Sequence, residues 1–175
     1  MAVDSSVARF STCLLAACAF MVWAPRPSFA SVTIAQIYAD LEKKGGRYVI
    51  DHYFEYPDAH AGADLVETGT REAVALGVKV MQHTDGGATT ALQSSLAEAL
   101  AKAPENVLPY VDTNPTTLAA KEICLPFLSA EEPAQKLRAI IERTRKSLLR
   151  VTARNLQRQK AACLREVEKN LALLR

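Results

Sequence analysis

The segment TDGGATTALQSSLAEALAKAPENVL, residues 84–108, constrains the fold more than any other part of the sequence. Its apolar residues recur with helical spacing and form one stripe: Leu92, Leu96, Ala99 and Leu100. The residue before a proline is driven out of the helical conformation, so Ala103-Pro104 should end the helix. We therefore predict a helix over 87–102, with Thr84 or Asp85 as its N-cap.

The glycines at the start of this segment raise the alternative of a ligand-binding loop. Gly86-Gly87 has neither the preceding strand nor the lysine that a phosphate-binding loop requires. We therefore interpret Thr84-Asp85-Gly86-Gly87 as the entry to a helix.

Similar patterns predict helices on the N-terminal side. One covers 34–44 and ends at Gly45-Gly46, in the manner of a C-cap. The stretch 48–56 fits a helix or a strand, and we favour a helix because no matching partner strand occurs. A loop or short turn then leads to a helix over 70–82, where Gly77 indicates a close approach of another helix.

On the C-terminal side we predict a short apolar segment over 106–110 and a short helix over 115–124. Two longer helices should follow from 132. The apolar residues before Val151-Thr152-Ala153 and those after it lie on different sides of a continuous helix, so we expect a bend or short turn there. The predicted fold class is all-α, a compact bundle of about six to seven short helices stapled by one disulfide.

The first 30 residues have the pattern of a secretory signal peptide. An apolar run from Phe10 to Trp23 follows Arg9, and Ser28-Phe29-Ala30 places small residues before a cut at Ala30. The alternative is a lipoprotein signal, Leu15-Ala16-Ala17-Cys18, which would anchor the chain through Cys18. We therefore expect a periplasmic or secreted protein, with 31–175 as a single helical domain and no transmembrane span.

Removal of the signal peptide leaves two cysteines, Cys124 and Cys163. An even pair in an exported protein predicts a disulfide. A redox-active pair is the alternative, but the local Cys-x-x-Cys spacing that tunes such thiols is missing.

Charge is distributed unevenly along the sequence. Residues 31–120 carry 6 Lys and Arg against 12 Asp and Glu, whereas 121–175 carry 13 against 6. Five basic residues recur at three- and four-residue spacing and form a candidate partner-binding face: Arg143, Lys146, Arg150, Arg154 and Arg158. This face could bind an acidic protein, anionic lipid or nucleic acid, or it could be a solvated face partly neutralised by the acidic half.

The expected export and the near-neutral net charge of the whole chain argue against nucleic acid as the partner. A membrane-surface helix would carry bulky aromatic residues on its apolar face, and this stretch has none. Among the possible partners of this face, a protein is the preferred interpretation, and the solvated face stays open beside it.

Sequence motifs for catalysis or metal binding are missing. His52 and His60, with Asp58 and Asp64 nearby, could supply zinc ligands, but neither a His-Glu-x-x-His motif nor an i, i+4 histidine pair occurs. No Gly-x-Ser-x-Gly motif marks a nucleophile. We predict no catalytic residues, no metal site and no cofactor.

The block around the 87–102 helix resembles a family of small exported bacterial proteins with no assigned activity. The residues that carry the resemblance are Asp85, Gly87-Ala88, Leu92, Glu98-Ala99-Leu100, Pro104 and Asn106-Val107-Leu108, followed by the two cysteines. The sequence departs from the family pattern at Gly86, usually alanine, and it lacks an Asp-Pro break in 151–155. The resemblance implies an exported all-helical protein and implies nothing about its activity.

Together these features predict an exported, non-enzymatic helical protein that binds another protein, for example as an immunity or inhibitor protein. The alternative is a periplasmic carrier of a small molecule or metal, using the region of His52, His60 and Asp85. The sequence does not indicate the oligomeric state.

Overall fold

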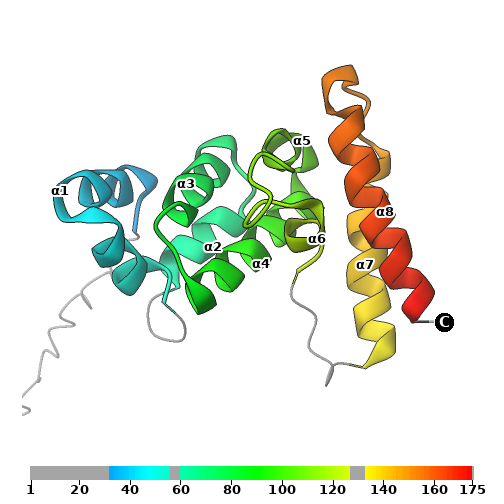
Figure 1. The fold of residues 1–175 in the computed structure, drawn as a ribbon, viewed down its shortest axis with the longest axis horizontal. Coiled ribbons are helices and arrows are strands. Elements are labelled where there is room, and N and C mark those ends of the chain that lie inside the picture. The colour runs from blue at the N-terminus through cyan, green and yellow to red at the C-terminus, as the bar shows by residue number, and fades with distance from the viewer. Residues whose placement is uncertain (1–31, 56–59, 127–132, 175) are drawn as a thin grey trace, which may run out of the picture. The chain divides into compact units, whose positions relative to one another are not determined.

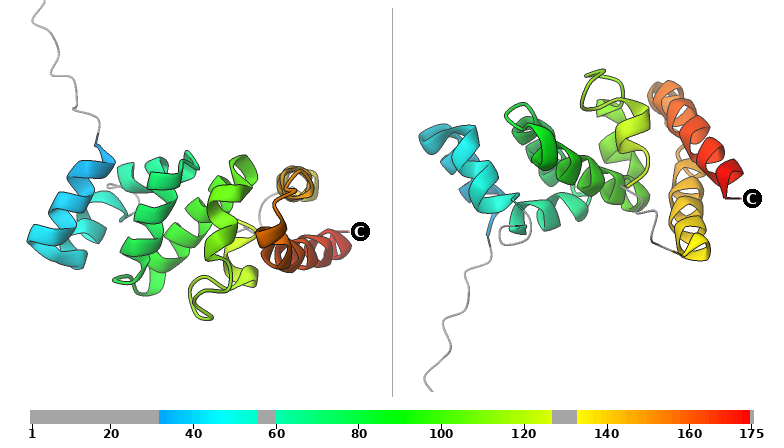
Figure 2. Two further views of the ribbon diagram at one scale, coloured as in Figure 1. Left: turned by 90° about the horizontal axis from the view of Figure 1, so that it is seen from above. Right: turned by 60° about the horizontal axis from the view of Figure 1, so that its bottom comes forward.

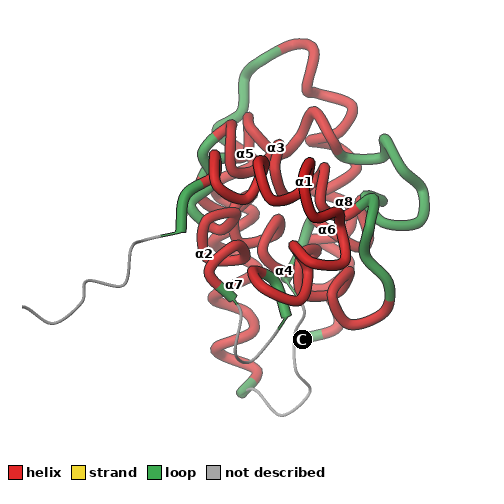
Figure 3. The backbone as a smooth tube through the Cα atoms, turned by 90° about the vertical axis from the view of Figure 1, so that its left-hand side faces the viewer, coloured by secondary structure: helices red, strands yellow, loops and turns green. Residues whose placement is uncertain are grey.

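The computed structural model describes residues 32–55, 60–126 and 133–174, and within these ranges it contains helices and loops but no strand (Figure 3). The helices, in chain order, are α1 (Ile34–Tyr53), α2 (Ala61–Glu67), α3 (Arg71–Met81), α4 (Gly86–Lys102), α5 (Pro104–Val107), α6 (Ala120–Ile123), α7 (Ala134–Leu149) and α8 (Gln157–Leu173). Two 3-10 turns, η1 (Leu108–Tyr110) and η2 (Arg154–Leu156), join them. The all-α prediction is confirmed.

Residues 32–175 cluster as one compact unit. None of the helices in the described ranges is both long and apolar enough to cross a membrane. The predicted signal peptide, its cut at Ala30 and the alternative anchor at Cys18 lie outside the described residues.

Helix α4 is the centre of the helical unit, with α1 at one end and the α7–α8 pair at the other (Figures 1 and 2). It packs against α2, α3, α5, α6 and α7. The apolar stripe predicted for this helix is fully buried: Leu92, Leu96, Ala99 and Leu100. Pro104 begins the next helix, so α4 ends where the sequence predicts.

Helix α1 contains the break that the sequence predicts at Gly45-Gly46. Gly45 has φ 84° and ψ 170°, a conformation that glycine adopts without steric cost. The residues after the break are helical, so the helix prediction for this stretch is confirmed. Tyr53 Oη donates a 2.6 Å hydrogen bond to Asp40 and accepts one from Gln36, which ties the two halves of α1 together.

Two short segments differ from the sequence predictions. Residues 61–67, expected to be a loop or turn, form α2, whose Val66 is fully buried. Its few apolar residues form no clear period, so tertiary packing rather than local pattern stabilises it. The helix expected over 115–124 begins only at Ala120, because Asn114 Oδ1 accepts hydrogen bonds from the backbone of Thr116 and Thr117.

The C-terminal region forms two helices, as predicted. Helix α7 ends at Leu149 and α8 begins at Gln157. Lys160 Nζ reaches back from α8 and donates hydrogen bonds to the carbonyl oxygens of Leu149, at 3.3 Å, and Val151, at 2.8 Å. A basic side chain thus satisfies carbonyl groups that the end of α7 leaves unpaired.

The predicted disulfide joins Cys124, which follows α6, to Cys163 in α8. The two Cα atoms are 5.1 Å apart, and both side chains are fully buried. The bond attaches the C-terminal helix to the central helices.

We expect Gly77→Ala to lower the free energy of unfolding by about 1 kcal/mol. A Cβ at position 77 would lie 2.9 Å from Cγ2 and 3.1 Å from Cγ1 of Val66, so the Val66 side chain or the packing of α2 on α3 would have to shift. Overpacking costs about 1–3 kcal/mol, which exceeds the gain of about 1 kcal/mol in helix propensity. Urea denaturation followed by circular dichroism measures the effect.

Gly87→Ala is the matched control for this change. A Cβ at position 87 would meet no atom within 4 Å, so we expect this variant to be about 0.5 kcal/mol more stable than the wild type. Equal effects at the two positions would contradict the close approach of α2 and α3.

Candidate partner-binding surface

Helix α7 packs against α4 on one side and α8 on the other, and its third side is exposed. Arg143 donates a 2.6 Å hydrogen bond to Glu98 of α4, and Arg145 donates one of the same length to Glu168 of α8. The pairing with Glu168 raises the pKa of Arg145. Between these two flanks, Lys146 and Leu149 face outward.

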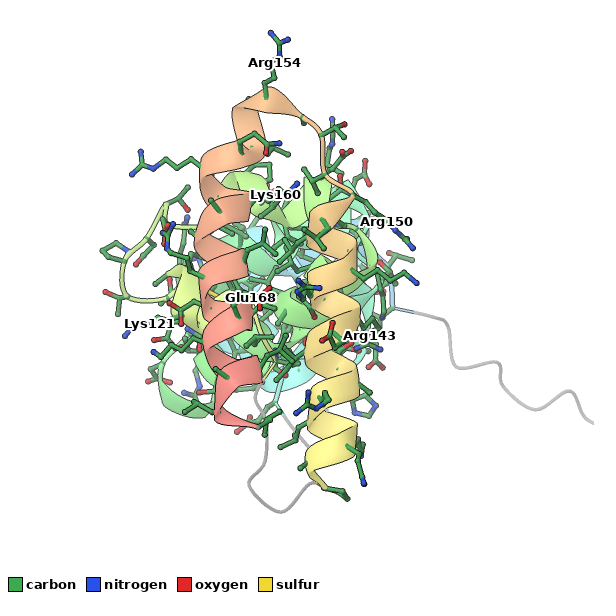
Figure 4. The ribbon with its side chains drawn as sticks, turned by 90° about the vertical axis from the view of Figure 1, so that its right-hand side faces the viewer. Lys121, Arg143, Arg150, Arg154, Lys160 and Glu168 are labelled. Atoms are coloured by element: carbon green, nitrogen blue, oxygen red, sulfur yellow. A yellow bond between two sulfur atoms is a disulfide. The ribbon has the colours of Figure 1, made fainter. Side chains whose placement is uncertain are left out.

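The structure places the five predicted basic residues in two groups. Arg143, Lys146 and Arg150 belong to the last turns of α7 and its C-cap, whereas Arg154 lies in η2 and Arg158 in α8. Figure 4 shows Arg143 and Arg150 on one side of α7, with Arg154 projecting from the connection to α8. A continuous basic face would require an unbroken helix, and the break after Leu149 separates the two groups.

The five residues also differ in their partners. Arg143 is paired with Glu98, so one member of the predicted face is neutralised by the acidic half of the chain. The other four, Lys146, Arg150, Arg154 and Arg158, form no ion pair with a residue that the structure describes. Their charges are available to a partner.

Two hollows flank the last turn of α7. The outer one, which we call the α7 hollow, has a volume of about 480 Å³ and is lined by Ala139, Glu142, Arg143, Arg145, Lys146 and Leu149. The α4–α7 pocket has a volume of about 300 Å³ and is lined by Lys102, Ala103, Pro104, Glu105, Asn106, Ser147, Arg150 and Val151. Leu149 is 50% exposed, whereas most large apolar residues in the described ranges are buried or partly buried.

A polar cluster that the sequence did not reveal joins α2 to α4 beside the α4–α7 pocket. Ser95 Oγ donates a 3.4 Å hydrogen bond to the carboxylate of Glu67, and Lys102 Nζ donates one of 2.7 Å to the Glu67 carbonyl oxygen. Burial is the main cause that raises the pKa of the Glu67 carboxyl. Glu67 and Ser95 are far apart in sequence, so only the packing of α2 on α4 brings them together.

We expect the free energy of unfolding of the Glu67→Gln variant to increase, relative to that of the wild type, as the pH rises from 4 to 7. The folded-state pKa of Glu67 is raised, so its contribution to stability is fully present below the unfolded pKa and is lost as the pH rises through the folded value. Glutamine does not titrate and avoids this loss. Urea denaturation of both proteins across this pH range measures the difference, and a constant difference would contradict the raised pKa.

The histidines considered as metal ligands each have a local partner. His52 Nδ1 lies 2.9 Å from the carbonyl oxygen of Tyr48, and the two rings stack with centroids 3.7 Å apart. His60 Nε2 lies 3.7 Å from Asp64. Within the described ranges, which do not include Asp58, no group of three His, Cys, Asp or Glu residues could hold a metal ion.

The entry to α4 differs in detail from the predicted cap. Asp85 is the N-cap residue, but its side chain makes no capping hydrogen bond. Thr84 bonds instead to the carbonyl oxygen of Met81, at 3.0 Å, and to the hydroxyl of Thr89, at 2.8 Å. Thr84 therefore links the end of α3 to the first turn of α4.

A third hollow, of about 330 Å³, lies between α1 and this entry. Its charged lining residues are Arg47, Asp51, Glu55 and Asp85. Arg47 and Asp51 form an ion pair with each other, at 2.9 Å.

No protein-family model matches the chain, and neither a curated protein nor a solved structure is significantly similar to it.

Proposed function

We propose that the protein is an exported, non-enzymatic helical module that binds another protein through the exposed side of α7. The observation that carries this proposal is the surface around Leu149. A half-exposed leucine lies beside Lys146 and Arg150, which have no acidic partner among the described residues, and a hollow lies on each side. Protein interfaces combine an apolar centre with a polar rim, and arginine is enriched in them.

The proposed export to the periplasm or beyond has two supports. Residues 1–30 have the composition of a signal peptide, with Cys18 lipidation as the alternative. The buried Cys124–Cys163 disulfide is typical of proteins that fold in an oxidising compartment. An immunity or inhibitor protein, which binds one exported partner and needs no catalytic residues, is the version of this function that we favour.

Site-specific photocrosslinking in intact cells tests the proposal. We expect a crosslinker at Leu149 to capture one defined protein, and the double variant Lys146→Glu/Arg150→Glu to abolish that product. Leu173, which is 75% exposed on α8, is the matched control position. Equal products from both positions, or a product that the charge reversal leaves unchanged, would argue against binding through α7.

The alternative function, a carrier of a metal or small molecule, has no comparable observation in its favour among the described residues. Metal analysis of protein purified without chelators addresses it, because a carrier should retain about one equivalent of metal and melt at a higher temperature with it.

A further inference from the structure

The lining of the α4–α7 pocket includes three residues with side-chain hydrogen-bond donors, one from α4 and two from the end of α7. Lys102 is the last residue of α4, Ser147 lies in the last turn of α7, and Arg150 is the C-cap residue of α7. Ser147 is a buried residue, with 9% of its surface exposed, and its hydroxyl makes no hydrogen bond with a described residue. A hydroxyl in this position has a free donor for a ligand.

The charge of the pocket indicates the class of ligand. Lys102 and Arg150 contribute two positive charges, and Glu105 contributes one negative charge. The remaining charge of one unit matches a single carboxylate better than a phosphate, which carries more negative charge at neutral pH. Hydrogen bonds from lysine and arginine to a carboxylate are among the strongest that side chains form.

The shape and position of the pocket favour a side chain over a free chain end. Half-buried Ala103 and Pro104 form an apolar wall that suits the methylene groups of a glutamate. The pocket also adjoins the turn of α7 that exposes Lys146 and Leu149, so a bound segment would have to continue across that surface. An internal residue can continue across that surface on both sides of its side chain, whereas a C-terminal residue continues on one side only.

We propose, on the basis of the proposed function, that this pocket receives one glutamate side chain of the partner protein. Lys102 Nζ, Ser147 Oγ and the Arg150 guanidinium bind its carboxylate. Arg150 faces the partner from α7, whereas Lys102 holds the α2–α4 packing through the Glu67 carbonyl oxygen as well. Arg154, on the connection between α7 and α8, takes no part.

A peptide titration followed by NMR tests this assignment. The protein is isolated after export of the full-length chain. The probe is a short acetylated and amidated peptide with one glutamate among alanine and leucine residues. We expect amide shifts within 102–106 and 147–151. Binding should weaken at least about tenfold for the matched glutamine peptide and for Arg150→Gln, as expected for the loss of a charge-assisted hydrogen bond.

Further variants separate the pocket from general charge effects. Ser147→Ala should also weaken binding, whereas the control Arg154→Gln, which lies outside the pocket, should bind as the wild type does. Equal binding of the glutamate and glutamine peptides would overturn the proposal. So would shifts confined to the α7–α8 connection, or binding only of a glutamine peptide that ends in a free carboxylate.

The peptide titration and the crosslinking experiment can fail independently of each other. A crosslink from Leu149 without peptide binding would overturn the glutamate pocket and leave binding through α7 intact. Peptide binding in the pocket without any crosslink from Leu149 would support the pocket and overturn the broader surface.

Discussion

Replacement of both disulfide cysteines, Cys124→Ala/Cys163→Ala, is expected to lower the free energy of unfolding by about 4 kcal/mol. The bond closes a loop over a sequence separation of 39 residues. Without it, the unfolded chain gains the conformational entropy that the loop removes. Urea denaturation of the variant and of the oxidised wild type measures the loss.

Reduction of the wild type provides the control for this prediction. A reductant should lower the stability of the wild type by a similar amount and should leave the variant unchanged, because the variant has no bond to reduce. A loss below about 1 kcal/mol in the variant would mean that packing alone holds α8, against the stabilising role assigned to the bond.

Leu96→Ala is expected to lower the free energy of unfolding by about 3 kcal/mol. Leu96 is fully buried in α4, the helix against which most others pack. Truncation removes apolar contacts and leaves a cavity that the surrounding helices fill only partly. Thermal and urea denaturation both report the change.

The same substitution at an exposed position separates burial from helix propensity. Leu173 is 75% exposed, so Leu173→Ala should change the stability by no more than about 0.5 kcal/mol. Similar losses at both positions would contradict a core centred on α4.

The long helices could be predicted because their local signals agree with their packing. The spacing of apolar residues predicts the buried side of α4, and Gly45 predicts the break in α1. The end of α7 is predicted because the row of apolar residues moves to another side of the helix near Val151. The disulfide could be predicted because the sequence after the predicted signal peptide offers only one pair of cysteines. Helix α2 could not be predicted, because it is short and depends on its packing against α3 and α4.

The candidate site was predictable only in part. The spacing of basic residues identified Lys146 and Arg150, but it also grouped them with Arg154. In the structure Arg154 lies in η2 and projects from the connection between α7 and α8 (Figure 4). Lys102 and Ser147, which complete the α4–α7 pocket, gave no signal in the sequence. They meet only because α4 and α7 pack side by side, and that arrangement is a property of the tertiary structure.

The position of the disulfide determines what a single proteolytic cut does to the protein. Every peptide bond between Leu125 and Ala162, including all those of α7, lies inside the covalent ring that Cys124 and Cys163 close. A protease that cuts once in this stretch produces two chain ends but no separate fragments. The cut molecule keeps its mass apart from one added water, and its two parts stay covalently joined until the disulfide is reduced.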